Sequence, residues 1–587
     1  MVSEKDKKTT GYPSVDRPWL KFYSNASVNS PLPACTMYDY VLKKNRDFQD
    51  IVAIRYYDNT ITYGEFFKAI DETADMLAWL GVENGDMVTI CSITTPETIY
   101  AIYACSKIGA ICNIVEPRAN AESIEERVNN TESKVLIVLD MCFHKLNPEN
   151  IKVNKIVLTS IGQSMDFVSK IGYMATLSMD VHPVKYTEQV NTWNFYKNRA
   201  IVHGRSIKAE YAKDSVAAII YTSGTTGGSK GAMLTDDAIN AIAYQYEFLF
   251  KYKRGEVFLN IIPPFVAGGL ACDVHMPLSL GLTVTIIPRF KPVHFDDYLI
   301  KYKPNFFRGA PSYFENFVRS RKLKDADLSY IKVAAMGGDA LNVELETEIE
   351  QFLTDHGSKS GVLKGYGMTE MASTAATLSF RTGSKLGSVG IPLPRNLISI
   401  FEPGTEEELK YGQQGEICIS GPSMMKEYYK KPEETEKVIK KHKDGRLWVH
   451  TQDVGYIDEE GFIYFTGRIK RIIIRPDGHN VWPSAIEAFL IKQEGVKDCA
   501  VIGADNPYGK SGKIPTAFIV KDESCNKLNN ELEQYLRKAS EEKLEGRDAA
   551  QKYFFIDKIP TTLAGKVDYR RLEDYAAENW SESLVLI

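Results

Sequence analysis

Paired cysteines are absent from this sequence. Its nine cysteines are scattered, and no two of them have the CxxC spacing. The sequence therefore indicates neither a zinc framework nor a redox framework of that kind, and free thiols in a chain of 587 residues fit a reducing compartment. An excess of positive charge is also lacking, because 71 basic and 76 acidic residues leave a net charge of −5. Nothing in that balance suggests nucleic acid as a partner.

A long apolar run is lacking as well. The first residues, MVSEKDKKTTG, are charged and contain no apolar segment, so we expect no signal peptide. The apolar stretch Ile99–Val115 is interrupted by Ser106, Lys107 and Asn113 and is too short to cross a bilayer. We therefore expect a cytoplasmic protein with no membrane span.

What the chain does have is a loop rich in glycine and hydroxyl groups at Tyr221–Gly231, YTSGTTGGSKG, directly after the apolar run Val216–Ile220. Its glycines let backbone N–H groups point inward, its hydroxyls add donors, and its lysine adds a positive charge, which together favour a bound phosphate. The loop matches neither the Walker pattern nor the GxGxxG pattern. We predict a nucleotide-phosphate site formed by Thr222, Ser223, Gly224, Thr225, Thr226 and Lys230.

Apolar runs of strand length alternate with amphipathic helical stretches over much of the chain. The early part of this pattern predicts strands at Met87–Ser92, Gly109–Val115 and Val135–Leu139, and helices at Glu97–Ile108 and Ala121–Asn130. Thr95 and Asn120 are suited to cap these two helices. Later strands are predicted at Val257–Ile262, Thr283–Pro288, Val333–Met336 and Val362–Lys364. Such an alternation is typical of parallel sheets with helical crossovers.

The pattern changes after Gly412 to short strands and turns, as in Gly415–Ser420 and Tyr456–Phe465, which predicts a β-rich subdomain. The basic segment Arg468–Asn480 has the composition of a junction. A small α+β unit is predicted beyond it, with helices at Ser484–Lys492 and Leu528–Lys543 and strands at Ala500–Ile502, Ala517–Val520 and Lys552–Phe555. We therefore predict an α/β fold in which a large N-terminal domain (residues 1–469) has two βαβ-type sheets plus the β-rich subdomain, and a small C-terminal domain covers residues 470–587.

Five more motifs follow the phosphate loop. They are GGDA at 337–340, GYGMTE at 365–370, TQD at 451–453, GRIK at 467–470 and PTTLAGK at 560–566. Their order and approximate spacing resemble the core motifs of the adenylate-forming superfamily, which includes acyl-CoA synthetases, peptide-synthetase adenylation domains and luciferases. The resemblance extends from about Thr62 to Lys566. It implies that the small C-terminal domain is mobile and swings between two half-reactions.

The resemblance also assigns roles to single residues. It places the ring of Tyr366 against adenine, where flat π faces stack, and makes Glu370 a ligand of Mg²⁺, a cation that prefers carboxylate oxygen. Asp453 resembles the carboxylate that binds the ribose hydroxyls, and Arg468 its ribose and phosphate partner. The other residues of the ATP site that the resemblance implies are Gly338, Asp339, Ala340, Gly367, Met368 and Thr369.

The implied reaction has two steps. A carboxylate attacks the α-phosphorus of ATP to give an acyl-adenylate and pyrophosphate, and the thiol of CoA then displaces AMP, so that ATP, Mg²⁺ and CoA are required. Lys566 is the implied catalytic lysine, which neutralises the carboxylate and the phosphate as they approach each other. Thr226 and Glu370 are implied to assist it, and Lys470 matches the hinge.

The chain departs from the family pattern at two places near the hinge. The family usually has Gly where this chain has Gln452, although the following acid is retained. The loop after the hinge, RPDGHN, is one residue longer than usual and lies where the thiol tunnel is expected.

The acid that is activated depends on a pocket near IPPFVAGGLA. Val266 stands where many CoA ligases carry His, and no carboxylate is placed there to bind an α-ammonium group. We predict an acyl pocket formed by Val266, Gly268, Gly269, Met336, Gly365 and Met371, suited to a medium- or long-chain fatty acid or another apolar acid. Asp273 and His275 complicate this prediction if their helix turns them inward.

Two alternatives remain open at this point. A stand-alone adenylating enzyme that loads the phosphopantetheine of an acyl carrier protein would share the first half-reaction. A non-catalytic nucleotide- or acyl-binding protein would have little use for Lys566, and the joint presence of Lys230, Glu370, Asp453 and Arg468 argues against it. The sequence indicates no oligomeric state.

Overall fold

The computed structural model describes residues 9–176, 182–203, 205–222, 229–337, 343–477, 479–505, 512–544, 549–561 and 567–580. The chain forms two compact units. The larger consists of Arg17–Ile398 and Ile419–Val449, and the smaller of Met1–Asp16, Ser399–Cys418 and His450–Ile587. The division that the sequence predicts between residues 469 and 470 stays a prediction.

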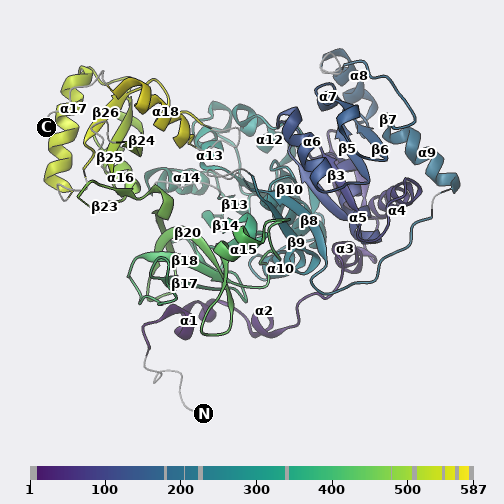
Figure 1. Cartoon of the computed structure of the whole chain (residues 1–587), viewed down its shortest axis with the longest axis horizontal. Helices are drawn as coiled ribbons and strands as arrows, with labels where there is room; N and C mark the ends of the chain where they lie inside the picture. Colours follow the sequence, from purple (N-terminus) through teal and green to yellow (C-terminus); the bar gives the residue numbers. More distant parts are fainter. Residues whose placement is uncertain are drawn as a thin grey trace, which may run out of the picture. The chain divides into compact units, whose positions relative to one another are not determined.

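A seven-stranded sheet in the larger unit confirms the predicted parallel architecture (Figure 1). All its neighbouring strands are parallel except the final hairpin, in which β9 runs antiparallel to β8. Its strands, in spatial order, are β7 (Val190–Thr192), β6 (Lys155–Thr159), β5 (Val135–Leu139), β3 (Met87–Cys91), β4 (Ile111–Val115), β8 (Val216–Tyr221) and β9 (Gly231–Thr235).

Helices cover this sheet, and two of them begin at polar caps. The side chains of Thr95 and Asn120 accept backbone N–H bonds at the starts of α5 (Pro96–Ile108) and α6 (Ala121–Asn130), as predicted. Ile124 of α6 packs with strand residues in a buried apolar cluster. Other helices of this region are α4 (Tyr63–Trp79), α7 (Asp140–Phe143), α8 (Phe167–Thr176) and α9 (Trp193–His203).

A nine-stranded sheet forms the second large layer of the same unit. Its centre is parallel, and its two edges are antiparallel. The order is β16 (Ile391–Pro392), β15 (Ser373–Thr377), β14 (Val362–Met368), β13 (Val333–Met336), β12 (Phe306–Gly309), β10 (Val257–Asn260), β11 (Thr283–Ile286), β1 (Val52–Tyr56) and β2 (Asn59–Thr62). The β1–β2 hairpin comes from a segment for which the sequence predicted no strand.

Further helices of the larger unit surround these strands. A buried apolar cluster joins α12, α13 and α14 to β10, β12 and β13. The elements are α2 (Asn25–Asn29), α3 (Met37–Asn45), α10 (Asp236–Glu247), the π-helix η5 (Gly269–His275), α11 (Met276–Ser279), α12 (Phe295–Tyr302), α13 (Pro311–Val318), α14 (Val343–Asp355), η8 (Thr369–Met371) and α15 (Pro432–Val438).

The predicted β-rich subdomain is a five-stranded sheet. Its path is β17 (Leu397–Phe401), β18 (Gly415–Ser420), β20 (Leu447–Ile457) and β19 (Ile439–Lys441), with β21 (Ile463–Arg468) paired to β20. The predicted strand region Tyr456–Phe465 contains the turn between β20 and β21.

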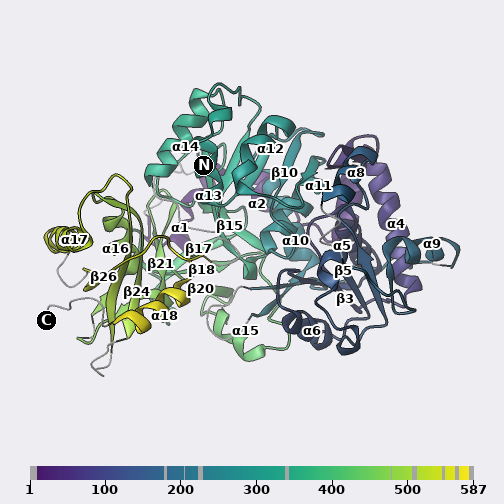
Figure 2. The same ribbon diagram turned by 90° about the horizontal axis from the view of Figure 1, so that it is seen from above.

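The C-terminal region is the predicted small α+β fold. Its three-stranded sheet has the order β24 (Val496–Asp505), β25 (Lys513–Lys521) and β26 (Lys552–Phe555). One face packs on α16 (Pro483–Leu490) and α17 (Asn529–Lys543), and the other on α18 (Tyr569–Asn579), as Figure 2 shows. Ala517 and Ile519 face one cluster while Phe518 and Val520 face the other, which is the period of two expected for a strand covered on both sides.

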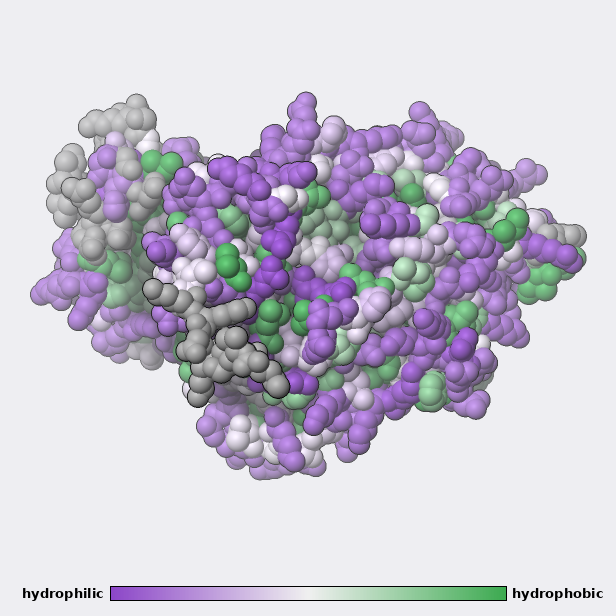
Figure 3. All heavy atoms as spheres, turned by 90° about the horizontal axis from the view of Figure 1, so that it is seen from below, coloured by the Kyte–Doolittle hydropathy of each residue, from purple (hydrophilic) through white to green (hydrophobic). Residues whose placement is uncertain are grey.

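Hydrophilic side chains cover most of the face drawn in Figure 3, with hydrophobic ones scattered among them. Within the described ranges, every helix is too short or too polar to cross a membrane.

Candidate functional site

The base of the predicted phosphate loop is a β-hairpin. Tyr221 of β8 pairs with Gly231 of β9. The N–H of Thr222 donates to the carbonyl of Lys230 at 2.9 Å, and the hydroxyl of Ser229 donates to the carbonyl of Thr222 at 2.7 Å. The loop is therefore closed at its ends, and the predicted strand before it is confirmed. Ser223, Gly224, Thr225 and Thr226 lie outside the described residues.

Lys230 makes two electrostatic contacts at the end of this loop. Its Nζ lies 2.5 Å from Oε2 of Glu434 on α15 and 5.1 Å from the ring centroid of Tyr428. The hydrogen bond from Lys230, and a second one from Lys437, lower the pKa of Glu434 to about 2. Glu434 is thus ionised at neutral pH and holds the lysine cation next to the loop.

Glu370 lies close to the same place. Its side chain is 8% exposed and accepts a hydrogen bond from the Tyr428 hydroxyl. Burial, together with the Glu370 charge, raises the pKa of Tyr428 well above its usual value. Tyr428 therefore stays protonated and donates to the carboxylate while its ring faces Lys230.

Backbone pairing explains how these distant residues meet. The N–H of Tyr429 donates to the carbonyl of Gly231, and the N–H of Met425 donates to the carbonyl of Glu370, each at 2.8 Å. The segment between Met425 and Tyr429 thereby links the phosphate loop to η8. Sequence reasoning missed Tyr428 and Glu434, because only their contacts, and no local pattern, distinguish them from other aromatic and acidic residues of the chain.

The predicted nucleotide motif GYGMTE, at residues 365–370, includes the end of β14, where this strand runs antiparallel to β15. A Cβ at Gly367 would lie 1.8 Å from the carbonyl oxygen of Ser373, so glycine is required there for the strands to approach. The ring of Tyr366 is 9% exposed, and Met368 and Thr369 continue into η8. Gly338, Asp339 and Ala340 lie outside the described residues.

The predicted ribose pair is brought together by strand register. Asp453 on β20 stands opposite Arg468 on β21, and Arg468 Nε lies 2.9 Å from Asp453 Oδ1. The Asp453 side chain is 7% exposed, whereas that of Arg468 is 56% exposed. The carboxylate is thus fixed by the sheet while the guanidinium extends into solvent. Their roles in ribose binding stay predictions.

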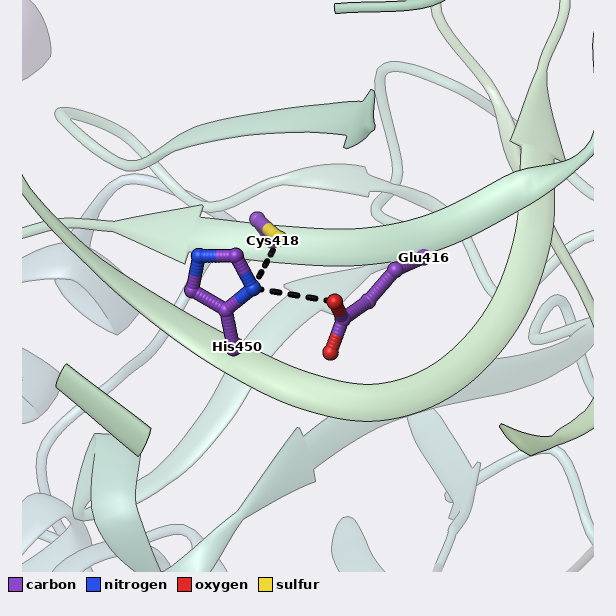
Figure 4. A group of neighbouring side chains, drawn as sticks. All are labelled: Glu416, Cys418 and His450. Carbon is purple, nitrogen blue, oxygen red and sulfur yellow. Dashed lines mark hydrogen bonds and ion pairs between the residues drawn. The ribbon is translucent and has the colours of Figure 1, made fainter. Parts of the chain in front are cut away.

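Glu416, Cys418 and His450 form a buried cluster, and His450 lies on the same strand as Asp453 (Figure 4). His450 Nδ1 lies 2.9 Å from Glu416 Oε2 and 3.6 Å from Cys418 Sγ. These three donor types suit a metal such as zinc. The carboxylate, however, is already engaged at both oxygens, because its Oε1 accepts the N–H of Gln452 at 2.9 Å. The cluster therefore acts here as a hydrogen-bond network beneath the backbone that leads to Asp453.

Gln452 adopts a left-handed backbone with φ of 60°. Glycine is the residue that takes this conformation at least cost, which accounts for the glycine usual in the family pattern. The departure at Gln452 keeps the turn and adds backbone strain. The hydrogen bond to Glu416 compensates for part of this strain.

The residues of the predicted acyl pocket fall into two groups. Gly268 and Gly365 border one short segment, because a Cβ on Gly268 would lie 3.1 Å from Ser373 Oγ and one on Gly365 would lie 3.6 Å from Thr374 Cγ2. The other members are placed as follows: Val266 is 44% exposed, Gly269 begins η5, Met371 is buried in η8, and Met336 packs in the apolar cluster of α12 to α14. Their roles in acid binding stay predictions.

Asp273 and His275 both turn inward on η5. Asp273 is fully buried and pairs with Arg308, whose Nη1 lies 2.9 Å from Asp273 Oδ1. Burial raises the pKa of Asp273 to about 7, although the arginine opposes this shift. His275 lies 3.1 Å from the Tyr103 hydroxyl and 2.9 Å from Asn240 Oδ1, and burial lowers its pKa to about 3. Asp273 is thus engaged by Arg308, which the sequence reasoning missed.

The two remaining predicted residues are the predicted hinge lysine and the predicted catalytic lysine. Lys470 lies within the 3-10 helix η9 (Ile469–Arg471), between β21 and the short strand β22 (Ile473–Ile474). Lys566 lies outside the described residues.

Two family models match the chain. The model described as AMP-binding enzyme matches residues 42–429, and the model described as AMP-binding enzyme C-terminal domain matches residues 485–566. The first of these matches covers more than half of the chain.

Individual proteins resemble the chain over most of its length. A long-chain-fatty-acid–CoA ligase of Bacillus subtilis is 30% identical over 96% of this chain and 99% of its own length. A probable 4-coumarate–CoA ligase of Dictyostelium discoideum is 29% identical over 87% and 90%, respectively. The crystal structure of ATP-bound MatB from Rhodopseudomonas palustris has a TM-score of 0.76 at 22% identity and covers 92% of this chain and 99% of that one.

Proposed function

Since this chain belongs to the AMP-binding enzyme family, whose acid–CoA ligases act through an acyl-adenylate, we propose that it joins an apolar carboxylic acid to CoA. The proposed acid is a medium- or long-chain fatty acid or an acid of similar polarity. The proposed reaction consumes ATP, releases pyrophosphate and AMP, and gives an acyl-CoA thioester.

The observation that carries this proposal is the contact chain from Lys230 through Tyr428 to Glu370. A cation, a phenol and a carboxylate from three distant segments meet at the closed end of the phosphate loop. Lys230 would bind a phosphate of ATP through its charge, exchanging Glu434 for the nucleotide. Binding of the phosphates there would orient the α-phosphorus for attack by the acid.

Glu370 is the proposed ligand of Mg²⁺. The fit is reasonable, because Glu370 offers a hard carboxylate oxygen, and Mg²⁺ usually binds one or two carboxylates together with substrate phosphates. When bound, Mg²⁺ would offset phosphate charge. The Tyr428 hydroxyl would orient the Glu370 carboxylate by its hydrogen bond.

Two observations support an apolar acid. A relative that matches nearly the whole chain is named for long-chain fatty acids, and another is named for 4-coumarate, whose acyl part is largely apolar. The acidic side chain on η5 that could have received an ammonium group, Asp273, is engaged by Arg308. A substrate with an α-ammonium group would therefore lack a ready counter-charge at this helix.

The test is AMP release from ATP and Mg²⁺ across a panel of carboxylic acids, with and without CoA, with products identified by mass. We expect AMP release with apolar acids that requires CoA and yields acyl-CoA. Adenylate that forms without turnover of CoA would indicate a carrier-protein acceptor instead. Absence of AMP with every acid would contradict the proposal.

A further inference from the structure

An ion pair of Arg308 and Asp273 lies next to residues of the predicted acyl pocket. Arg308 stands on β12, a strand whose preceding residue, Phe307, belongs to the buried apolar cluster. Because side chains alternate along a strand, Arg308 points to the opposite face, where η5 carries Asp273. A charged residue in so apolar a strand, FFRG, is the signal that could have singled it out.

The surroundings of this ion pair are polar. Cys272 Sγ lies 3.3 Å from the Ser373 hydroxyl and 3.7 Å from that of Thr374, and the Tyr246 hydroxyl lies 3.1 Å from that of Thr374. Each of these side chains is buried. A stable core would be filled more simply by apolar side chains, since a buried ion pair is weak evidence for stability. The polar cluster therefore needs another explanation.

The position of the cluster suggests that explanation. Arg308 Nη2 lies 3.3 Å from the place that a Cβ on Gly268 would occupy. Ser373 and Thr374 pair across the strands with Met368 and Gly367 of the predicted nucleotide motif GYGMTE. The cluster thus adjoins both the glycine expected to open the acyl pocket and the strand expected to hold the nucleotide.

Arg308 has donor groups left for a ligand. Its Nη1 donates to Asp273 Oδ1 at 2.9 Å and to the Gly268 carbonyl at 3.5 Å, and the Cys272 thiol also contacts the guanidinium. A guanidinium carries five N–H donors. The Arg308 side chain is 18% exposed, whereas that of Asp273 is fully buried, so Asp273 holds the guanidinium from the protein side.

We propose that Arg308, held by Asp273, is a specificity-determining residue that donates to a neutral oxygen in the acyl part of the substrate. This inference rests on the proposed function and narrows it to a mainly apolar acid that carries a hydroxyl or carbonyl group. A neutral oxygen fits better than a second carboxylate, because above pH 7 the ionised Asp273 carboxylate already balances the arginine charge. A carboxylate would leave one net negative charge in a largely buried site.

The test compares kcat/KM at pH 8 for a plain fatty acid, its hydroxy and oxo derivatives with the oxygen at successive carbons, and the matching diacid. We expect one oxygenated acid to exceed the plain acid at least tenfold, because a site built to hydrogen-bond an oxygen discriminates strongly against its absence. In the double variant Arg308→Met/Asp273→Leu, which removes both charges together, this preference is expected to fall at least tenfold. Arg308→Lys keeps the charge without the planar fork, and its preference for the oxygenated acid is expected to lie between those of the wild type and the double variant.

Arg319→Met serves as the matched control, because Arg319 forms an exposed pair with Glu315 on α13 and is not expected to alter the preference. A preference for the plain acid or for the diacid would overturn the inference. An unchanged ratio of kcat/KM for the oxygenated acid to that for the plain acid in both Arg308→Lys and the double variant would also overturn the inference. AMP release by these proteins would still support the proposed ligase activity. If the double variant fails to fold, the preference measured in Arg308→Lys alone tests the inference. A wild-type enzyme that releases no AMP with any acid would overturn the proposed function and this inference together.

Discussion

Burial shifts the pKa values of two neighbouring ionisable side chains in opposite directions. Asp273 and His275 are both fully buried on η5, and burial favours the neutral form of each, so that the aspartate pKa rises to about 7 and the histidine pKa falls to about 3. As the pH falls below about 6.5, protons bind His275 more tightly in the unfolded chain, and the free energy of unfolding decreases. Asp273 has the opposite effect: as the pH falls from about 7 to its usual pKa, protons bind it more tightly in the folded chain, and the free energy of unfolding increases.

We predict that His275→Gln weakens the acid sensitivity of folding. The amide can replace the bond to Asn240, and it carries no proton-dependent charge. The decrease in unfolding free energy between pH 7 and pH 5 should be smaller in the variant by about 2 kcal/mol, at about 1.4 kcal/mol for each pH unit below about 6.5. Denaturant unfolding at the two pH values measures this. The Asp273 contribution is common to both proteins, so equal decreases would contradict the burial argument.

At the scale of single elements, η5 depends on close backbone approach at one of two adjacent glycines. A Cβ on Gly269 would lie 1.9 Å from the carbonyl oxygen of Pro263, which is backbone and cannot rotate away. A Cβ on Gly268 would instead meet the ends of the Ser373 and Arg308 side chains at 3.1 and 3.3 Å. The two positions therefore make a matched comparison.

We predict that Gly269→Ala lowers the free energy of unfolding by about 3 kcal/mol and that Gly268→Ala changes it by less than about 1 kcal/mol. Urea denaturation of the full chain measures both. A Gly269→Ala protein as stable as wild type would mean that η5 can move away from Pro263.

The backbone of β20 at Gln452, next to Asp453, depends on Glu416 in a comparable way. Glu416→Ala removes the acceptor for both Gln452 N–H and His450 Nδ1. We predict that it raises KM for ATP about tenfold, with a smaller effect on kcat, because about 1.4 kcal/mol of ribose positioning is lost. Gln452→Gly, which relieves the left-handed backbone, should leave KM for ATP near that of wild type. Steady-state kinetics with varied ATP measures both, and an unchanged KM in Glu416→Ala would refute the positioning role.

Local patterns predicted most elements but not their pairing. Val135–Leu139 and Val333–Met336 were predicted with their observed limits, because each apolar run is bounded by residues that end a strand. The strand predicted at Val257–Ile262 ends at Asn260, since Ile261 and Ile262 join the apolar cluster without ladder bonds. An apolar run reports burial, and pairing depends on neighbours that a local window does not contain. The contacts of Lys230 with Glu434 and of Arg308 with Asp273 were unpredictable for the same reason.

At the scale of the whole molecule, the two steps of the proposed reaction differ in whether they require Lys566. We predict that Lys566→Ala abolishes adenylate formation and spares thiolysis of a supplied acyl-adenylate, because the lysine charge is needed only while carboxylate and phosphate approach. Single-turnover assays of each half-reaction measure this. Equal loss in both would contradict the swinging-domain account.

The ion pair of Lys230 and Glu434 has a further consequence for the free enzyme. Glu434 is an internal competitor for the cation that the nucleotide needs, so each binding event includes an exchange of one anion for another. Added salt weakens the attraction of Lys230 to Glu434 and its attraction to the nucleotide alike. The nucleotide affinity of this chain should therefore depend less on ionic strength than that of a variant, Glu434→Gln, in which the lysine has no internal carboxylate to give up.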